Sequence, residues 1–321
     1  MKTSDIEVIA IGELLIDMIA DNPGMKMEFQ TSFTRYPGGA PANFAVNVRR
    51  LGINSGVITK IGDDFFGRFL IDTLNNENVD TSNIAVTKEY KTALAFVGLD
   101  DQRKPNFSFY RSPCADIMLN TSEISEDYIK NAKFLMYGTV SMADEPVRSA
   151  IYEAVKIAKK NGIKVICDPN LREDLWHFQD PTEHLLKVIQ DTDIILPSMD
   201  EAEFLTGEMG KKAIDALLDL GPKMVCMTKG SEGSLIQTGD GVFSAPAFNV
   251  NVVDTTGAGD AFAAGVCVGL ILNFPMKKLP YFANAVSAIK IQRSGGMSGP
   301  SLDEVQKFLK KQPDLPKFVL E

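Results

Sequence analysis

One short segment combines two glycines, an acidic residue and the start of an apolar helix. Its sequence is Asp-Thr-Thr-Gly-Ala-Gly-Asp over residues 254–260. Gly257 and Gly259 allow the backbone to approach a ligand closely, and N–H groups at a helix start stabilise an anion such as a transferred phosphoryl group. Asp260 has the chemistry to accept a proton from an attacking hydroxyl. The ordinary alternative is that the segment only caps a helix and Asp260 complements its dipole.

A second glycine-rich turn favours a catalytic role for this segment over simple helix capping. Residues 37–45 read Pro-Gly-Gly-Ala-Pro-Ala-Asn-Phe-Ala and open the first full predicted helix. Asn43 lies one turn inside this helix, where its side chain can face a cleft. Together with Asp17, Gly39 and Asn43 supply the hydrogen-bond donors and acceptors that a polyol requires. The alternative is that this turn is merely a flexible helix entry.

Polar residues also follow four apolar runs that we predict to be buried parallel strands, at residues 6–11, 164–167, 193–196 and 224–227. In chain order they are Glu13, Asp17, Asp168, Asn170, Ser198, Glu201, Thr228, Gly230 and Gly233. Ligands of open parallel sheets bind beyond the carboxyl ends of the strands. Four such strand ends in one chain therefore indicate a binding site there.

Several other functions are excluded by missing motifs. The chain has neither the G-x-x-x-x-G-K-[ST] loop nor a G-x-G-x-x-G after its first strand, which argues against a P-loop enzyme and a nicotinamide dehydrogenase. Its four cysteines form no C-x-x-C pair and its two histidines no H-E-x-x-H motif, which argues against a disulfide framework and against zinc or acyl-transfer sites. A net charge of −9 without a basic run argues against nucleic acid or an anionic membrane as the main partner.

Length and composition describe an ordinary globular protein. The 321 residues, 45% hydrophobic and 23% charged, suit one large α/β domain or two smaller domains. The polar N-terminus lacks a signal-peptide pattern, and the apolar stretch 261–272 is shorter than the ~20 residues that span a bilayer. We therefore expect a cytoplasmic protein with reduced cysteines.

Strand and helix patterns alternate through residues 134–293, which predicts an α/β fold with a mostly parallel sheet. The predicted helices lie at residues 42–51, 146–160, 201–206, 211–220, 259–272 and 279–293. Residues 15–37 and 89–112 instead alternate polar and apolar residues. This pattern predicts antiparallel strands with one solvent-exposed face, either as a small sheet projecting from the body or as ordinary edge hairpins.

These motifs together resemble the ribokinase-type (PfkB-type) carbohydrate kinases, and within that family the fructokinases. The glycine-rich turn at residues 37–43 is similar to the family's first signature, and residues 254–260 match its second. Residues 109–116, 168–172 and 203–207 are similar to fructokinase segments in the same order. The resemblance runs from about residue 6 to residue 300, which is nearly the whole chain.

The resemblance implies a three-layer α/β/α fold with a mostly parallel central sheet and a small β-sheet lid. Residues 1–14, 38–88 and 113–321 would form the nucleotide- and sugar-binding core. Residues 15–37 and 89–112 would form the lid. Lids of this family often pair between subunits, so a homodimer joined through the lid is expected.

The resemblance also implies a role for each site residue. Asp260 would be the general base, and the N–H groups of Gly257, Ala258 and Gly259 would form an anion hole. The sugar would be held by Asp17, Gly39, Asn43, Arg111 and Arg172. ATP would lie against Thr228, Gly230, Gly233 and Asn284.

Two kinds of metal ion are implied as well. Glu201 would order magnesium through water, although the family often has Asn-x-x-Glu where this chain has Ser198-Met199-Asp200-Glu201, and Ser198 is shorter than Asn. Many members also bind a monovalent cation such as potassium, for which Asp254 and Thr256 match ligand positions. The turn at residues 294–300 departs from the commoner Gly-Ala pattern, which leaves the remaining ligands of this cation open.

The function that follows is transfer of the γ-phosphoryl group of ATP, with Mg²⁺, to a hexose hydroxyl, with D-fructose at O6 favoured. One alternative keeps the reaction and changes the acceptor to 2-keto-3-deoxygluconate, ribose or a nucleoside, because one sequence does not show how buried polar groups pair with substrate hydroxyls. A more distant alternative is a non-catalytic sugar sensor. The intact Asp260 and its two neighbouring glycines argue against a sensor.

Overall fold

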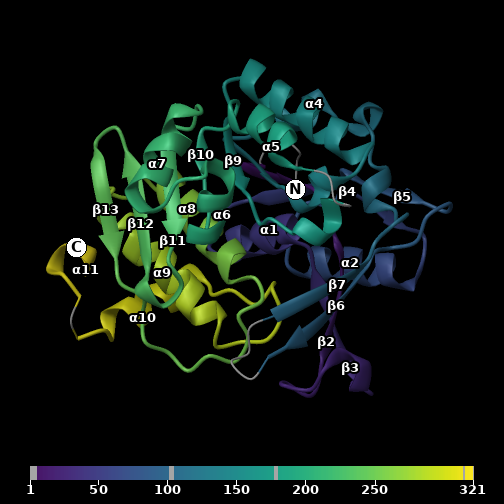
Figure 1. Cartoon of the computed structure of the whole chain (residues 1–321), viewed down its shortest axis with the longest axis horizontal. Coiled ribbons are helices and arrows are strands. Elements are labelled where there is room, and N and C mark those ends of the chain that lie inside the picture. Colours follow the sequence, from purple (N-terminus) through teal and green to yellow (C-terminus); the bar gives the residue numbers. More distant parts are fainter. Residues whose placement is uncertain (1–5, 101–104, 177–179, 314, 321) are drawn as a thin grey trace.

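The computed structural model describes residues 6–100, 105–176, 180–313 and 315–320, and within them nine strands form one central sheet (Figure 1). Its order is β13-β12-β11-β10-β9-β8-β1-β4-β5. The strands are β1 (Val8–Ile11), β4 (Ser55–Gly62), β5 (Ile84–Thr87), β8 (Phe134–Gly138), β9 (Lys164–Asp168), β10 (Ile194–Ile195), β11 (Met224–Thr228), β12 (Ser234–Thr238) and β13 (Gly241–Ala245). All neighbours from β5 to β11 pair parallel, and β12 and β13 are antiparallel at one edge. The predicted mostly parallel sheet is confirmed.

Helices cover both faces of this sheet, because its strands are apolar on both sides. Val8 and Ala10 of β1 pack into one buried cluster with α1, α2, α8, α9 and α10, whereas Ile9 and Ile11 pack into a second cluster with α3 to α7. Figure 1 shows α4 and α5 at the top of the view and α9 and α10 at the bottom. The helices are α1 (Ala40–Arg50), α2 (Phe65–Asn76), α3 (Glu126–Ile129), α4 (Val147–Lys160), α5 (Thr182–Ile189), α6 (Met199–Thr206), α7 (Gly210–Asp219), α8 (Ala258–Ile271), α9 (Leu279–Lys290), α10 (Leu302–Lys310) and α11 (Lys317–Leu320). The predicted three-layer architecture is therefore confirmed.

A smaller sheet of order β3-β2-β6-β7 projects from the body at the lower right of Figure 1. Its strands are β2 (Leu15–Ala20), β3 (Phe33–Gly38), β6 (Leu94–Leu99) and β7 (Pro105–Tyr110). Each hairpin is antiparallel as predicted, but β2 and β6 pair parallel where they meet. The reason is that each hairpin leaves the main body with its first strand, so both inner strands run outward together.

Parts of the predicted segments lie outside the described residues, namely residues 1–5, 177–179, 314 and 321 of the core and 101–104 of the lid. That the small sheet acts as a lid stays a prediction. In the described part of the chain, no helix is long and apolar enough to cross a membrane.

Candidate active site

A cavity of about 260 Å³ opens at the carboxyl ends of the parallel strands. Its wall is built from β2, β7, the starts of α1 and α8, the last residues of β9 and β11, and residues that follow β9 and β10. Of the residues singled out in the sequence, it brings together Asp17, Gly39, Asn43, Arg172, Glu201, Thr228, Thr256, Gly257, Ala258, Gly259 and Asp260. Parallel strands end at the same edge of a sheet, which is why positions so far apart in the chain share one wall.

The start of α8 forms one side of this cavity. Gly257 is in the left-handed region at φ 76°, and the helix begins at the next residue. A Cβ on Gly257 would lie 2.7 Å from the Cα of Gly296, so only glycine fits. The Asp254 carboxylate shapes the preceding turn, accepting hydrogen bonds from the N–H groups of Thr256 and Gly295, both at 2.8 Å. The first residues of α8, from Ala258 to Asp260, therefore line the cavity at the positive end of the helix.

Asp260 lies in the first turn of α8 and is only 5% exposed. Its Oδ2 accepts a hydrogen bond from Asn43 Nδ2 at 2.8 Å. Burial raises the pKa of Asp260 to about 6, against the lowering effect of the Asn43 hydrogen bond. The other amide atom of Asn43, Oδ1, is buried and has no hydrogen-bond partner among the described residues. A buried acceptor without a partner next to an acidic group points to a ligand hydroxyl.

Asp17 is the second buried carboxylate of the wall, reaching in from β2. Gly38, which pairs with Leu15 at the end of β3, lies against this carboxylate, and a Cβ there would collide with it. Burial raises the pKa of Asp17 to about 7, and the negative charges of Asp260 and Asp254 add to the effect. At neutral pH this side chain is therefore able both to donate and to accept hydrogen bonds.

Arg111 does not belong to this wall, although it was expected to reach the sugar from the small sheet. Its guanidinium donates to Asp116 Oδ2 at 2.5 Å, to the Val140 carbonyl at 2.9 Å and to Ser141 Oγ at 3.3 Å. Ser141 in turn donates to Glu13, which lines the cavity. The Asp116 carboxylate pairs with the Arg111 guanidinium and holds it away from the cavity. Arg111 therefore contacts Glu13 only through Ser141.

Glu201 lies beside Asp168 in the wall, at the start of α6. Its carboxylate accepts hydrogen bonds from the Leu171 N–H at 2.9 Å and from both N–H and Oγ of Ser198 at 2.8 and 2.9 Å. Burial raises the pKa of Asp168 well above its usual range, and the charges of Glu201 and Asp260 raise it further. Two carboxylates close enough to repel each other supply the oxygen ligands that a divalent cation prefers.

A second cavity, of about 610 Å³, adjoins the first. It contains the predicted nucleotide residues Thr228, Gly230, Gly233 and Asn284. Both cavities share Thr228, Thr255, Ala258, Gly259 and Phe262, so the start of α8 separates them. Within the described residues, no group of three or more His, Cys, Asp or Glu side chains is arranged to hold a metal ion. A magnesium ion here would therefore depend on phosphate oxygens and water for most of its ligands.

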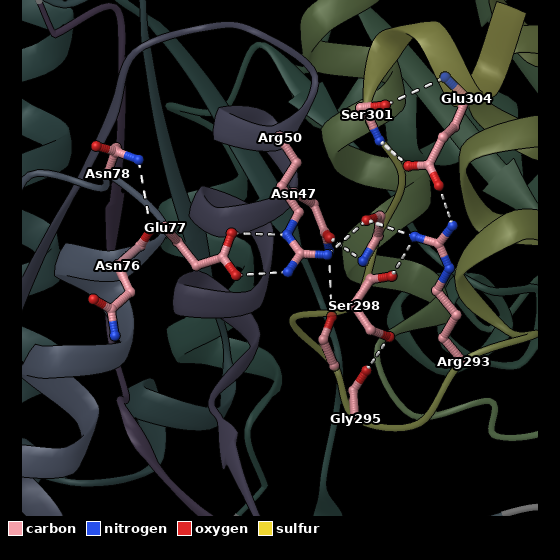
Figure 2. Close-up of polar contacts among 12 residues, drawn as sticks. Asn47, Arg50, Asn76, Glu77, Asn78, Arg293, Gly295, Ser298, Ser301 and Glu304 are labelled. Atoms are coloured by element: carbon pink, nitrogen blue, oxygen red, sulfur yellow. Dashed lines mark hydrogen bonds and ion pairs between the residues drawn. The ribbon is translucent and has the colours of Figure 1, made fainter.

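The turn after α9 that supports Gly257 is held by polar contacts (Figure 2). Arg50 at the end of α1 forms two hydrogen bonds with Glu77, at 2.8 and 2.6 Å, and a third with the Gly299 carbonyl at 2.9 Å. Asn47, one turn earlier, accepts from the Gly299 N–H at 3.0 Å and donates to the Gly296 carbonyl at 3.4 Å. These contacts tie α1 to the turn against which the start of α8 packs.

Comparison with known proteins identifies the family of this chain. A family model described as pfkB family carbohydrate kinase matches residues 5–303. The chain belongs to the pfkB family. Fructokinase-2 of Oryza sativa subsp. japonica is 36% identical to this pfkB-family chain over 315 residues, covering 95% of this chain and 94% of that protein.

Solved structures of fructokinases agree with this assignment. A fructokinase from Vibrio cholerae O395 with fructose, ADP and calcium ion bound has a TM-score of 0.86 at 30% identity, covering 95% of this chain and 99% of that chain. A double mutant of fructokinase from the same organism, with fructose, ADP and potassium ion bound, has a TM-score of 0.85 at 28% identity, with the same coverage. The pfkB-family chain is therefore a phosphotransferase that acts on a sugar.

Some residues of the pfkB site were given no role from the sequence. Glu13 and Asp168 were singled out only because they follow predicted strands, and both line the first cavity. Phe107 and Phe109 also line the first cavity, but in sequence they are only part of an alternating strand. Lys290, buried at the end of α9, carried no sequence signal, since it follows ordinary helix residues.

Proposed function

We propose that this pfkB-family chain is a fructokinase, which transfers the γ-phosphoryl group of ATP to O6 of D-fructose and yields fructose 6-phosphate. The observation that carries the proposal is that two adjoining cavities meet at the first turn of α8, where Asp260 lies. A phosphoryl group passing from one cavity to the other would cross this helix start. The fructokinases among the relatives and solved structures support fructose as the acceptor.

The first cavity has the polar groups that a sugar needs. Asp17 and Asn43 present buried oxygen and nitrogen atoms from two different elements, and the backbone of Gly39 lies between them. The unpaired Oδ1 of Asn43 would accept a sugar hydroxyl. Arg172, which lines the same cavity and lies 5.1 Å from the Phe107 ring, would contact the sugar or the transferred phosphoryl group.

Asp260 would act as the general base. As the hydroxyl oxygen bonds to the phosphorus and the bond to ADP breaks, the hydroxyl proton would pass to Asp260. A pKa of about 6 keeps this carboxylate mostly ionised at neutral pH, yet basic enough to accept the proton. The N–H groups of Gly257, Ala258 and Gly259 would stabilise the charge on the transferred group. The Ala258 N–H donates to the Thr255 carbonyl at 3.1 Å in this structure and would have to turn from it to do so.

The second cavity would hold ATP, with Thr228, Gly230 and Gly233 near the phosphates and ribose. Asn284, whose Nδ2 donates to the carbonyls of Ala245 and Pro246 at 3.2 and 3.0 Å, would lie near the adenine. When bound, Mg²⁺ would neutralise charge on the phosphates. Asp168 and Glu201 would hold its water ligands.

The small sheet would act as a lid. Phe107 and Phe109 of β7 line the sugar cavity and stack with their ring centroids 5.7 Å apart. Closing these rings over the sugar would exclude water and so prevent wasteful hydrolysis of ATP.

A coupled assay of ADP release, with ATP, Mg²⁺ and a panel of sugars, tests the proposal. We expect the highest kcat/KM with fructose, and Asp260→Asn should lower kcat at least about a hundredfold while melting temperature and sugar binding are kept. A higher kcat/KM with 2-keto-3-deoxygluconate, ribose or a nucleoside would refute fructose as the acceptor. Near-normal turnover by Asp260→Asn would refute the role of the base. No ADP release with any sugar would favour a sugar sensor.

A further inference from the structure

A lysine is buried beneath the proposed anion hole. Lys290, the last residue of α9, exposes 0% of its surface. Lysine is almost never fully buried unless it is paired, because removing an ammonium group from water is costly. Yet in the described part of the chain no carboxylate forms an ion pair with it. Its Nζ instead donates to a backbone oxygen, the carbonyl of Asp254, at 3.0 Å.

This carbonyl belongs to the turn that leads into α8. Asp254 is held on all sides: its backbone N–H donates to the Ile291 carbonyl at 3.1 Å, and its carboxylate accepts from two N–H groups. Ser287, one turn before Lys290 on α9, donates to the carbonyl of Ala258 at 2.9 Å. The end of α9 therefore packs against the start of α8 on the side away from the sugar cavity. Lys290 brings a positive charge to this contact.

Burial lowers the pKa of Lys290, and the negative charges of Asp254, Asp260 and Asp17 oppose this by favouring the ammonium form. Two of them line the sugar cavity. The ammonium group thus lies on the protein side of the catalytic turn, where a fixed positive charge strengthens the field of the helix start toward an anion.

A bound potassium ion does not fit this arrangement well. Potassium is held by oxygen atoms, chiefly carbonyls. Each oxygen of Asp254 already accepts a hydrogen bond, and the carbonyl oxygen accepts it from a cation. The Thr256 hydroxyl is buried without a hydrogen-bond partner among the described residues, so it remains open, but it is a single neutral oxygen. A second cation beside the same carbonyl would be repelled by Lys290.

We propose that the ammonium group of Lys290 replaces a bound monovalent cation, so that phosphoryl transfer by this chain does not require potassium. The inference rests on the proposed function, because it assigns Lys290 to support of the anion hole. Lys290 is a positioning residue in this scheme. Its charge acts through the turn at Asp254 and the first N–H groups of α8, without contact with the substrates.

The test compares potassium, sodium and choline chlorides at equal ionic strength, using the sugar with the highest turnover. Wild-type activity should be the same in all three salts. Lys290→Ala removes the charge and leaves a space, so kcat should fall about tenfold or more in choline, and potassium should restore most of it in a saturable way. Lys290→Met is the matched control, because it removes the charge but fills the space. Its activity should be low in every salt.

Thermal denaturation supplies a readout that does not depend on activity. Potassium should raise the melting temperature of Lys290→Ala, but not that of the wild type or Lys290→Met. Potassium activation of the wild type overturns the proposal, and this result does not require the variants to fold. Full activity of Lys290→Ala in choline overturns it, as does a folded, weak Lys290→Ala that potassium neither activates nor stabilises.

Failure of the proposed function is a separate result, seen as no sugar phosphorylation by the wild type in any salt. The melting temperatures of Lys290→Ala in the three salts would still test whether Lys290 occupies a cation site.

Discussion

Removing the Asn43 side chain should shift the pH dependence of the reaction in a defined direction. The Asn43 amide donates to Asp260 at 2.8 Å, and a hydrogen bond to the charged form of an acid lowers its pKa. Asn43→Ala should therefore raise the pKa of Asp260. Because only ionised Asp260 accepts the proton, activity should be lost at a higher pH than in the wild type.

The size of the shift follows from the environment of Asp260. A hydrogen bond to a charged group contributes about 1.5–3 kcal/mol, and one pKa unit corresponds to about 1.4 kcal/mol. Water entering the space left by Asn43 would replace part of the lost interaction. We therefore expect a rise of about one unit, from about 6 to about 7.

The assay is the acid limb of kcat/KM against pH, which reports the free enzyme. Asp17 also titrates in this range, with a pKa of about 7, but only Asp260 receives the Asn43 hydrogen bond. The difference in the apparent pKa of the acid limb between Asn43→Ala and the wild type therefore reports the pKa of Asp260. Asn47→Ala is the matched control, since Asn47 lies one turn further along α1 and bonds to the turn at Gly296 instead. An unmoved limb in Asn43→Ala, or one moved to lower pH, would contradict the assignment.

Two further predictions concern stability. The pKa of Asp17 rises to about 7 from 3.8, so the folded state binds this proton more tightly and loses stability as pH rises from about 4 to 7. Asp17→Asn should therefore raise the melting temperature at pH 8, by the equivalent of up to about 4 kcal/mol, and change it little at pH 4; equal effects at both pH values would refute this. Arg111→Met leaves Asp116 buried without its partner and should cost about 3–5 kcal/mol in urea unfolding. Unchanged stability with a greatly raised KM would instead indicate direct sugar contact by Arg111.

The central sheet could be predicted because its strands are buried on both faces. Continuous apolar runs such as the one before Asp168 occur only where helices cover both sides, and the glycines after α1 and α4 mark helix ends. The parallel pairing of β2 and β6 could not be predicted from the hydrophobic pattern. Alternation of polar and apolar residues along a strand says nothing about the direction of the neighbouring strand. That direction depends on where the two hairpins leave the main body.

Site residues were predictable where their role depends on local backbone. Gly257 and Asp260 belong to one helix start, so spacing alone relates them. Arg111 does not line the cavity, because its direction depends on Asp116 and on the carbonyl of Val140, 29 residues further along the chain. Lys290 shows the same limit, since only the packing of α9 against α8 brings its ammonium group to Asp254.

The net charge of −9 also shows why composition says little about this site. Glu13, Asp17, Asp168, Glu201 and Asp260 line one cavity, and five full negative charges there would repel a phosphate group. Burial raises the pKa of Glu13, Asp17, Asp168 and Asp260, so near neutral pH these four do not all carry a full charge. Lys290 and the start of α8 add positive potential from the protein side. The charge of a carboxylate depends on its burial, so an acidic chain is able to build a site for a polyanion in which Arg172 is the basic residue of the cavity wall.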